Sequence, residues 1–233
     1  MARTLPAART DRPPEAVVAS IVLVEDHALL AEVLREELAS YDLAVRLVSP
    51  APDVLDRLAG VGEADLVLLD HDLGDDLPTG ADLIEPLVGR GIRVAMLTGV
   101  TDPATLGRCL RAGAIGVIPK TESFVVLVDQ IRAALDGRPI GPSPPKRSEY
   151  LDAARATDAD QMRRSTQLDQ LTAREQAVLR ALVEGQTIAE IADSSFVAVS
   201  TVRSQVKSLR RKLGVNTQVQ AVAMAAEAGW FAA

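Results

Sequence analysis

The chain has 233 residues, with 25 Lys and Arg against 32 Asp and Glu, which gives a formal net charge of −7. Its hydrophobic content of 48% and charged content of 24% exclude a disordered, a collagen-like or a disulfide-stapled chain. The negative total and an aromatic content of 3% argue at first sight against nucleic acid as a partner. The single cysteine, Cys109, indicates a reducing compartment.

The first residues contain arginine and proline and lack the apolar segment of a signal peptide. We therefore expect residues 1–19 to form a flexible arm. The longest apolar run near the start, Ala16 to Val24, has about half the length needed to cross a bilayer. These features predict a cytoplasmic protein with no membrane partner.

From Ser20 onward, short β-branched runs alternate with segments of helical spacing. The runs lie at 21–24, 43–48, 64–69, 92–97 and 114–118 and are mostly apolar, as strands covered on both faces are. One helical segment begins at Asp102-Pro103, where a capping side chain precedes a proline at the first helical position. The alternation predicts a doubly wound α/β domain at 20–137, a (βα)5 fold around a parallel sheet.

Residues 138–167 interrupt this alternation and are predicted to be a linker. Four of the chain's 13 prolines lie between residues 137 and 148, which predicts extended backbone there. The polar segment that follows is compatible with a helix.

Residues 168–233 show helical signals and no strand pattern. Thr172 and Glu175 form a capping box, in which a hydroxyl and a carboxylate satisfy free N–H groups at a helix start. The expected helices occupy residues 172–185, 187–193, 200–213 and 217–229, with Gly214 as a stop. This pattern predicts an all-α four-helix domain containing a helix-turn-helix.

Polar residues follow the predicted strands at their carboxyl ends, which meet at one edge of a parallel sheet. They are Glu25, Asp26, Asp70, Asp72, Thr98 and Lys120. Carboxylates brought together repel one another unless a cation lies among them, and Mg²⁺ prefers carboxylates with water and phosphate oxygens. One carboxylate can then attack a phosphoryl group, whose oxygens an ammonium and a hydroxyl group would hold.

This constellation resembles the receiver domain of two-component response regulators. The matching stretches are ED at 25–26, LLD at 68–70, MLTG at 96–99 and IPK at 118–120. The resemblance implies that Asp70 accepts a phosphoryl group from a histidine kinase, and that Thr98 and Lys120 bind that group. The implied Mg²⁺ ligands are Asp26, Asp70, the backbone carbonyl of Asp72 and, through water, Glu25.

Two positions depart from the receiver pattern. Val117 stands where the family usually carries a Tyr or Phe that rotates with the threonine, and Gly74 replaces a usual proline. These departures leave open a phosphorylation-independent regulator. The DHD stretch at 70–72 also resembles the nucleophile motif of haloacid-dehalogenase phosphatases, so a phosphatase fused to a DNA-binding domain is a further alternative. The acidic pair at 25–26 precedes that motif, which favours the receiver.

The predicted helix at 200–213 carries five basic residues and no acidic one. Its apolar residues form one stripe, and Arg203, Lys207, Arg210 and Arg211 share another face. The helix would be about 21 Å long at 1.5 Å per residue, which fits a major groove. A solvated cationic face is the simpler alternative.

The stretches at 171–185, 188–192, 200–215 and 228–230 resemble the LuxR-type helix-turn-helix. A receiver followed by this module is similar to the NarL/FixJ family of response regulators. The family implies binding of double-stranded DNA and formation of a homodimer when active or DNA-bound, often through the last helix, here about 217–227. The implied DNA contacts are Arg203, Ser204 and Lys207 to bases, and Thr201 and Arg210 or Arg211 to phosphates. Ala198 and Gln205 replace the usual Ser and His.

The net charge divides unequally between the predicted domains. Residues 1–167 carry a net charge of −8, whereas residues 168–233 hold 7 basic and 6 acidic residues, a net charge of +1. The acidic total therefore conceals a local cationic surface suited to DNA. The expected function is transcription control through Asp70 phosphorylation, by a protein that is not an enzyme in the ordinary sense.

Overall fold

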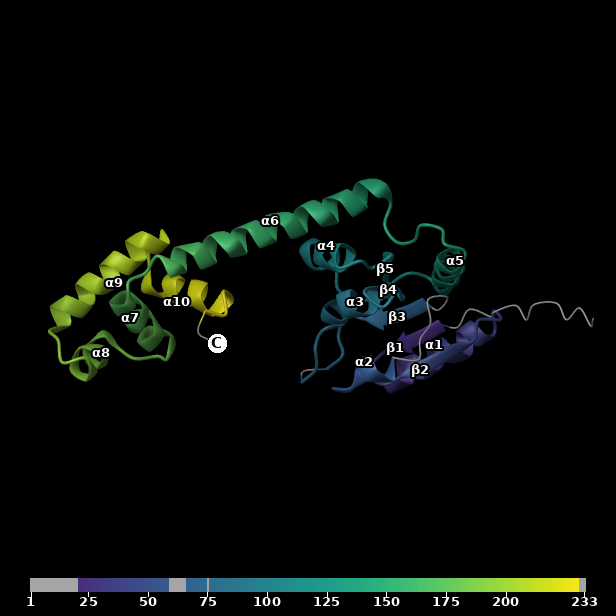
Figure 1. Ribbon diagram of the computed structural model, residues 1–233, viewed down its shortest axis with the longest axis horizontal. Helices are drawn as coiled ribbons and strands as arrows, with labels where there is room; N and C mark the ends of the chain where they lie inside the picture. Colours follow the sequence, from purple (N-terminus) through teal and green to yellow (C-terminus); the bar gives the residue numbers. More distant parts are fainter. Residues whose placement is uncertain (1–20, 59–65, 75, 231–233) are drawn as a thin grey trace, which may run out of the picture. The chain divides into compact units, whose positions relative to one another are not determined.

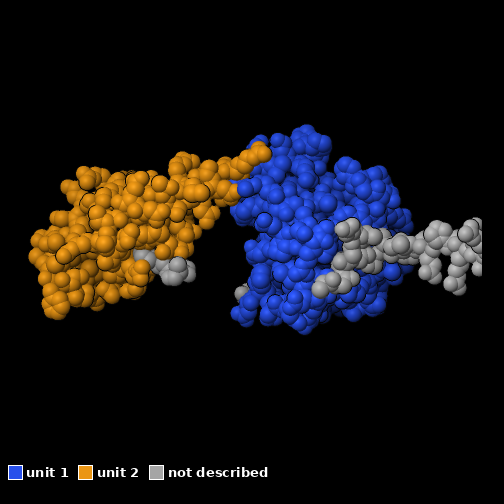
Figure 2. Space-filling model, viewed as in Figure 1, with its two compact units in different colours: residues 1–154 blue, residues 155–233 orange. Residues whose placement is uncertain are grey.

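The computed structural model describes residues 21–58, 66–74 and 76–230, so the expected arm at 1–19 lies outside the described residues. The chain divides into two compact units, residues 1–154 and residues 155–233, which are coloured separately in Figure 2. In the described part of the chain, no helix combines the length and the apolar character needed to cross a membrane.

The first unit is built on a five-stranded parallel sheet (Figure 1). Its strands are β1 (Ile21–Val24), β2 (Val45–Val48), β3 (Leu66–Asp70), β4 (Arg93–Thr98) and β5 (Gly116–Pro119). The order across the sheet is β2-β1-β3-β4-β5, and every neighbouring pair is parallel. The predicted doubly wound (βα)5 fold is confirmed, and all five carboxyl ends lie at one edge of the sheet.

Five helices alternate with these strands. They are α1 (Ala28–Ala39), α2 (Val54–Arg57), α3 (Gly80–Val88), α4 (Pro103–Arg111) and α5 (Phe124–Leu135). The predicted start of α4 is confirmed, because the Asp102 side chain accepts a hydrogen bond from Thr105 N and Pro103 occupies the first helical position.

Alternating strand residues face two separate apolar cores. Ile21 and Leu23 of β1 pack with residues of α1 and α5, whereas Val22 and Val24 pack with residues of α2, α3 and α4. This alternation follows from the period of two in a β-strand. Both faces of the sheet are therefore covered, and the polar residues that follow the strands gather at its carboxyl edge.

A long helix, α6 (Pro144–Asp169), connects the two units. It begins at Pro144 and Pro145, within the stretch expected to be extended. A proline is tolerated in the first turn of a helix, because its missing N–H group would have no partner there. The proline-rich composition alone therefore gave the wrong prediction for residues 144–148, while the segment that follows, which is compatible with a helix by sequence, is helical.

The second unit contains α7 (Ala173–Val183), α8 (Ile188–Ser194), α9 (Val199–Leu213) and α10 (Gln218–Glu227). Capping boxes begin α7, α8 and α10, and Gly214 ends α9 in the left-handed conformation with φ of 68°. Val202, Leu209 and Leu213 are fully buried in the core that these helices share. The predicted all-helical region with a helix-turn-helix is confirmed.

Candidate functional site

The acidic pocket lies at the carboxyl edge of the sheet and consists of Glu25, Asp26, Asp70 and Lys120. Lys120 Nζ lies 2.7 Å from Glu25 Oε2 and 2.9 Å from Asp70 Oδ2, so one ammonium group links the ends of β1 and β3. Both carboxylates are almost fully buried, with 3% of each residue exposed. The lysine therefore supplies the positive charge that two buried carboxylates need.

The charges in this pocket shift one another's proton affinity. Burial raises the pKa of Glu25 above its usual value, although the hydrogen bond from Lys120 opposes this shift. Burial alone would lower the pKa of Lys120, but its bonds to Glu25 and Asp70 outweigh that effect and raise it. Lys120 is thus held in the charged form that can attract an anionic phosphoryl group.

His27, the residue after Asp26, also contributes a possible ligand atom to this pocket. Its Nδ1 atom lies 2.7 Å from Asp26 Oδ1, and this hydrogen bond raises the pKa of the exposed imidazole. Among the described residues, ligand atoms of Glu25, Asp26, His27 and Asp70 all lie within 4.8 Å of one another. The adjacency of His27 to the acidic pair was the only signal in the sequence.

The donor set fits a hard divalent cation. Three carboxylates converge on a small volume, and oxygen is the ligand type that Mg²⁺ prefers. The Asp72 carboxylate lies outside this group, is exposed and accepts a hydrogen bond from Gly74 N at 3.3 Å. Of the predicted ligands, the carboxylates of Glu25, Asp26 and Asp70 therefore lie together, and the contribution of the Asp72 backbone carbonyl stays a prediction.

Thr98 ends β4 on the same edge and is 2% exposed. Its Oγ1 atom accepts a hydrogen bond from Val100 N at 2.9 Å, and its carbonyl oxygen accepts one from Lys120 N at 2.9 Å. Thr98 thus connects the loop after β4 with the lysine of the acidic pocket. The predicted residues Glu25, Asp70, Thr98 and Lys120 are brought together at one edge as expected.

The β3–α3 loop depends on one close approach of the backbone. Gly80 N donates to His71 O at 2.9 Å, and a Cβ atom on Gly80 would lie 1.9 Å from Asp70 O. A side chain at this position would displace the backbone of Asp70. Gly80 therefore positions Asp70, which the sequence did not indicate.

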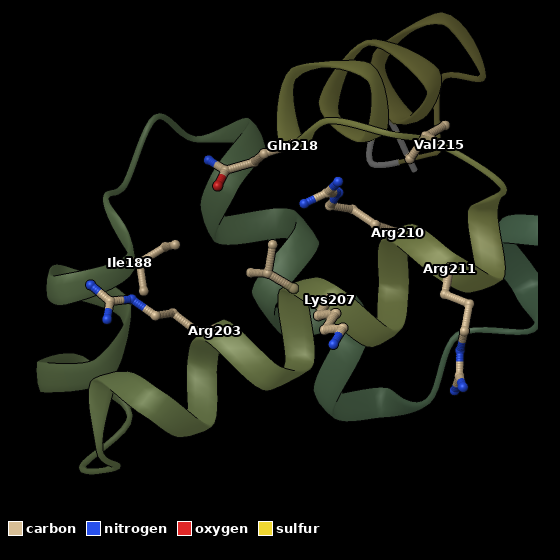
Figure 3. Close-up of a pocket in the computed structure, with 8 residues that line it drawn as sticks. Ile188, Arg203, Lys207, Arg210, Arg211, Val215 and Gln218 are labelled. Atoms are coloured by element: carbon tan, nitrogen blue, oxygen red, sulfur yellow. The ribbon is translucent and has the colours of Figure 1, made fainter.

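A basic pocket of about 580 Å³ lies on the second unit, along α9 (Figure 3). Its lining residues are Ile188, Arg203, Val206, Lys207, Arg210, Arg211, Val215 and Gln218. All four cations predicted to share one face of the helix therefore line it. Figure 3 shows Arg210 extending from α9 toward Gln218 of α10.

Arg210 has a buried donor without a partner. Its Nε atom is buried and makes no hydrogen bond to any described residue. An unpaired donor costs about 1–3 kcal/mol, more when charged, and a bound anion would remove that cost. The basic pocket is thus suited to a phosphate group.

The remaining predicted DNA contacts are accessible. Thr201, Arg203, Ser204 and Lys207 are exposed on α9. Ser204 Oγ donates to Ser200 O at 3.0 Å, so its oxygen lone pairs are left to accept from a base. Ala198 provides no side-chain cap for α9, in keeping with its departure from the usual serine.

Lys212 belongs to the same run of basic residues but has a different environment. Its Nζ atom lies 2.6 Å from Glu175 Oε2 and 3.4 Å from Gln170 O. The Glu175 carboxylate is itself part of the capping box at the start of α7, where it accepts from Thr172 N at 2.9 Å. Lys212 therefore joins the end of α9 to the start of α7.

Two family models match the chain. Residues 21–132 match the response regulator receiver domain, and residues 169–225 match the bacterial regulatory proteins of the luxR family. The first match contains the acidic pocket, and the second contains all of α9 and its basic residues.

Several relatives match most of the chain. The DNA-binding transcriptional activator DevR/DosR of Mycobacterium tuberculosis is 29% identical over 211 residues, or 89% of this chain and 94% of that protein. The nitrate/nitrite response regulator protein NarP of Escherichia coli is 27% identical over 89% of this chain and 94% of that protein. A solved structure of RcsB from Salmonella enterica serovar Typhimurium, bound to a promoter, is 22% identical with a TM-score of 0.49 over 89% of this chain and 97% of that one.

Proposed function

Because the chain belongs to the NarL/FixJ family of two-component response regulators, and controls transcription through a LuxR-type DNA-binding domain, we propose that a histidine kinase phosphorylates Asp70 and thereby changes DNA binding by α9. The chain is a transcription factor and not an enzyme, which excludes the haloacid-dehalogenase phosphatase alternative. The observation that carries the proposal is the contact of Lys120 Nζ with both Asp70 and Glu25.

In the proposed reaction, an Asp70 carboxylate oxygen forms a bond to the phosphorus of phosphohistidine while the P–N bond breaks. Lys120 neutralises the added charge, and the Thr98 hydroxyl donates to a phosphoryl oxygen. Mg²⁺ would be held by Asp26, Asp70, the Asp72 carbonyl and, through water, Glu25. When bound, it supplies positive charge opposite the phosphoryl oxygens.

The phosphorylation proposal is tested with acetyl phosphate and Mg²⁺, followed by intact mass. We expect a phosphoryl adduct on the wild-type chain and none on Asp70→Asn. Asp72→Asn is the matched control, because it keeps the backbone carbonyl and should keep the adduct. No adduct on the wild-type chain, with DNA binding intact, would instead identify the phosphorylation-independent regulator suggested by Val117.

For DNA, we propose that α9 enters the major groove, with Arg203, Ser204 and Lys207 reaching base edges. Thr201, Arg210 and Arg211 would contact phosphates. Gln218 also lines the basic pocket, together with Arg210. Its amide group can donate a hydrogen bond, so it would also contact a phosphate. The unpartnered Arg210 Nε supports a phosphate at that position.

We also propose a homodimer formed through α10 in the active or DNA-bound state. Val219, on the first turn of this helix, is 77% exposed. An exposed large apolar residue on an alanine-rich helix suits a helix–helix contact. Analytical ultracentrifugation of the chain before and after phosphorylation tests this proposal. Val219→Asp should keep the phosphorylated chain monomeric. Ala223→Asp, at another exposed position of α10, is the control for the general effect of an added charge.

A further inference from the structure

A small pocket of about 140 Å³ lies in the first unit between the sheet and the start of α6. Its lining includes Val100 from the loop after β4, Val117 from β5, and Lys146 and Tyr150 from α6. Val117 is 2% exposed, and its short side chain leaves this space open. The pocket therefore places an aromatic ring of the connecting helix next to the loop that follows Thr98.

The start of α6 packs closely against the first unit. A Cβ atom on Gly107 of α4 would lie 1.9 Å from Tyr150 O, which shows how near the two backbones are. Ala154 is fully buried, and Tyr150 and Leu151 pack against the core formed with α4. A displacement at this contact therefore moves the helix, because a packed interface leaves little room for independent motion.

The loop after β4 connects this pocket to the acidic pocket. Thr98 Oγ1 accepts its hydrogen bond from Val100 N, and Val100 lines the small pocket. If the hydroxyl moves toward a phosphoryl group on Asp70, Val100 N must follow or lose its partner. Loss of this hydrogen bond in a part-buried loop is unfavourable, so the displacement reaches the pocket wall.

We propose that Tyr150 is the positioning residue that couples Thr98 to α6. The inference rests on the proposed phosphorylation of Asp70. In the phosphorylated state, the 98–100 loop shifts and the Tyr150 ring moves further into the space beside Val117. Lys146 Nζ lies over its ring, 5.8 Å from the centroid, and both residues line the small pocket.

The helix that carries Tyr150 reaches both units. Ala154 is buried in the first unit, whereas Arg164 forms an ion pair with Glu227 of α10 in the second. The helix that Tyr150 moves is therefore the segment that leads from the first unit to the DNA-binding unit. This coupling needs no aromatic residue on β5.

The first test observes Tyr150 directly. The chain has 2 tyrosines, so full-length protein labelled with 3-fluorotyrosine gives two ¹⁹F signals, and Tyr150→Phe assigns them. With acetyl phosphate and Mg²⁺, the Tyr150 signal should shift, while Tyr41, which packs on Phe124, serves as the internal control. An adduct without a shift of Tyr150 would overturn the coupling and leave Asp70 phosphorylation standing. No adduct would overturn both.

The second test measures the same coupling from the acidic pocket, as the effect of Tyr150 on binding at Asp70. If Tyr150 stabilises the phosphorylated conformation, its loss must weaken binding of the phosphoryl analogue beryllofluoride. Tyr150→Ala should lower the affinity about fivefold, the smaller end of usual coupling strengths, while Tyr150→Phe retains it. Leu151→Ala is the matched control, because it removes packing from the same turn without lining the pocket. Equal affinities for Tyr150→Ala and the wild-type chain, both folded, would contradict the proposal.

Discussion

Two lysines on α9 show how residues of the same type differ in role. Lys207 is exposed and lines the basic pocket, whereas Lys212 is bonded to Glu175 at the start of α7. The two lie within one run of basic residues, so the sequence alone does not separate them. Their roles differ because the helical turn directs Lys212 toward the neighbouring helix and Lys207 toward solvent.

Replacing Lys207 by alanine should weaken DNA binding and its dependence on salt. Loss of its base contact should cost about 1–3 kcal/mol, and removal of its positive charge from the DNA surface should lower the slope of log affinity against log salt by up to about 0.9. Fluorescence anisotropy of a labelled duplex at several salt concentrations measures both effects. Arg174→Ala, an exposed charge on α7, is the control. Unchanged affinity and slope in Lys207→Ala would contradict the placement of α9.

The bond between Glu175 and Lys212 predicts a dependence of stability on pH. Burial alone would raise the pKa of Glu175, but hydrogen bonds from Lys212 and Thr172 lower it from 4.5 to about 2. A depressed folded pKa stabilises the fold above pH 4.5, and this contribution is lost as the pH falls toward 2. The loss should be on the order of 2 kcal/mol, allowing for the partial exposure of Lys212.

This loss is measured by thermal unfolding, followed by circular dichroism, at pH values from about 6 down to about 2.5. Glu175→Gln should be less stable than the wild-type chain at neutral pH and should lose less stability on acidification. Glu184→Gln, at the exposed end of the same helix, is the control. Identical acid profiles for Glu175→Gln and the wild-type chain would show that the ion pair contributes nothing.

For the helices, the sequence predicted the starts and stops that depend on residues close together in the chain. The cap at Asp102, the capping box at Thr172 and the stop at Gly214 each involve residues within a few positions and were all confirmed. The first turn of α6, from Pro144, was missed because its prolines suggested extended backbone, whereas the start of this helix packs against the core that contains α4.

The candidate site divides in the same way. Glu25, Asp70, Thr98 and Lys120 were predictable because each ends or directly follows a strand, and the carboxyl ends of parallel strands meet. The inclusion of His27, the need for glycine at position 80 and the bond of Lys212 to Glu175 depend on rotamers and on backbone approach. Spacing in a sequence does not encode those features.

Gly107→Ala tests the contact between α4 and α6. Inside a helix, alanine is favoured over glycine by about 1 kcal/mol, so propensity alone predicts stabilisation. The added methyl group would meet Tyr150 O at 1.9 Å, so we expect a net destabilisation of about 1–3 kcal/mol. Chemical denaturation measures it, with Gly99→Ala as the control because nothing lies within 4 Å of its added Cβ. A gain in stability would show that the two helices separate readily.

Across the whole molecule, charge is divided between the two sequence-predicted parts, residues 1–167 and 168–233, according to their chemistry. Residues 1–167 have a net charge of −8, and the carboxylates of the acidic pocket lie among them. Of the seven basic residues in 168–233, five lie on α9. The net charge of −7 therefore gives no information on the DNA-binding surface, whose charge is local.

The centre of α6 should exchange its amide hydrogens faster than either end. Residues 155–163 contain no buried residue, whereas Ala154 and Leu168 are fully buried on either side. A helix without tertiary packing is marginal over so few residues, so its hydrogen bonds open often. Hydrogen–deuterium exchange with mass spectrometry measures this, and α5 provides a packed helix for reference. Uniform protection along α6 would contradict the prediction.

The two units also differ in the sequence distance over which their contacts form. Ile21 of β1 pairs with Leu66 of β3, so a long loop must close before that pair forms. The capping boxes of α7, α8 and α10 close within three residues. Since chains rich in local contacts fold faster than parallel sheets, the DNA-binding unit acquires its structure sooner after synthesis than the receiver does. The receiver leaves the ribosome first, so its slower folding step can begin before the DNA-binding unit has been synthesised.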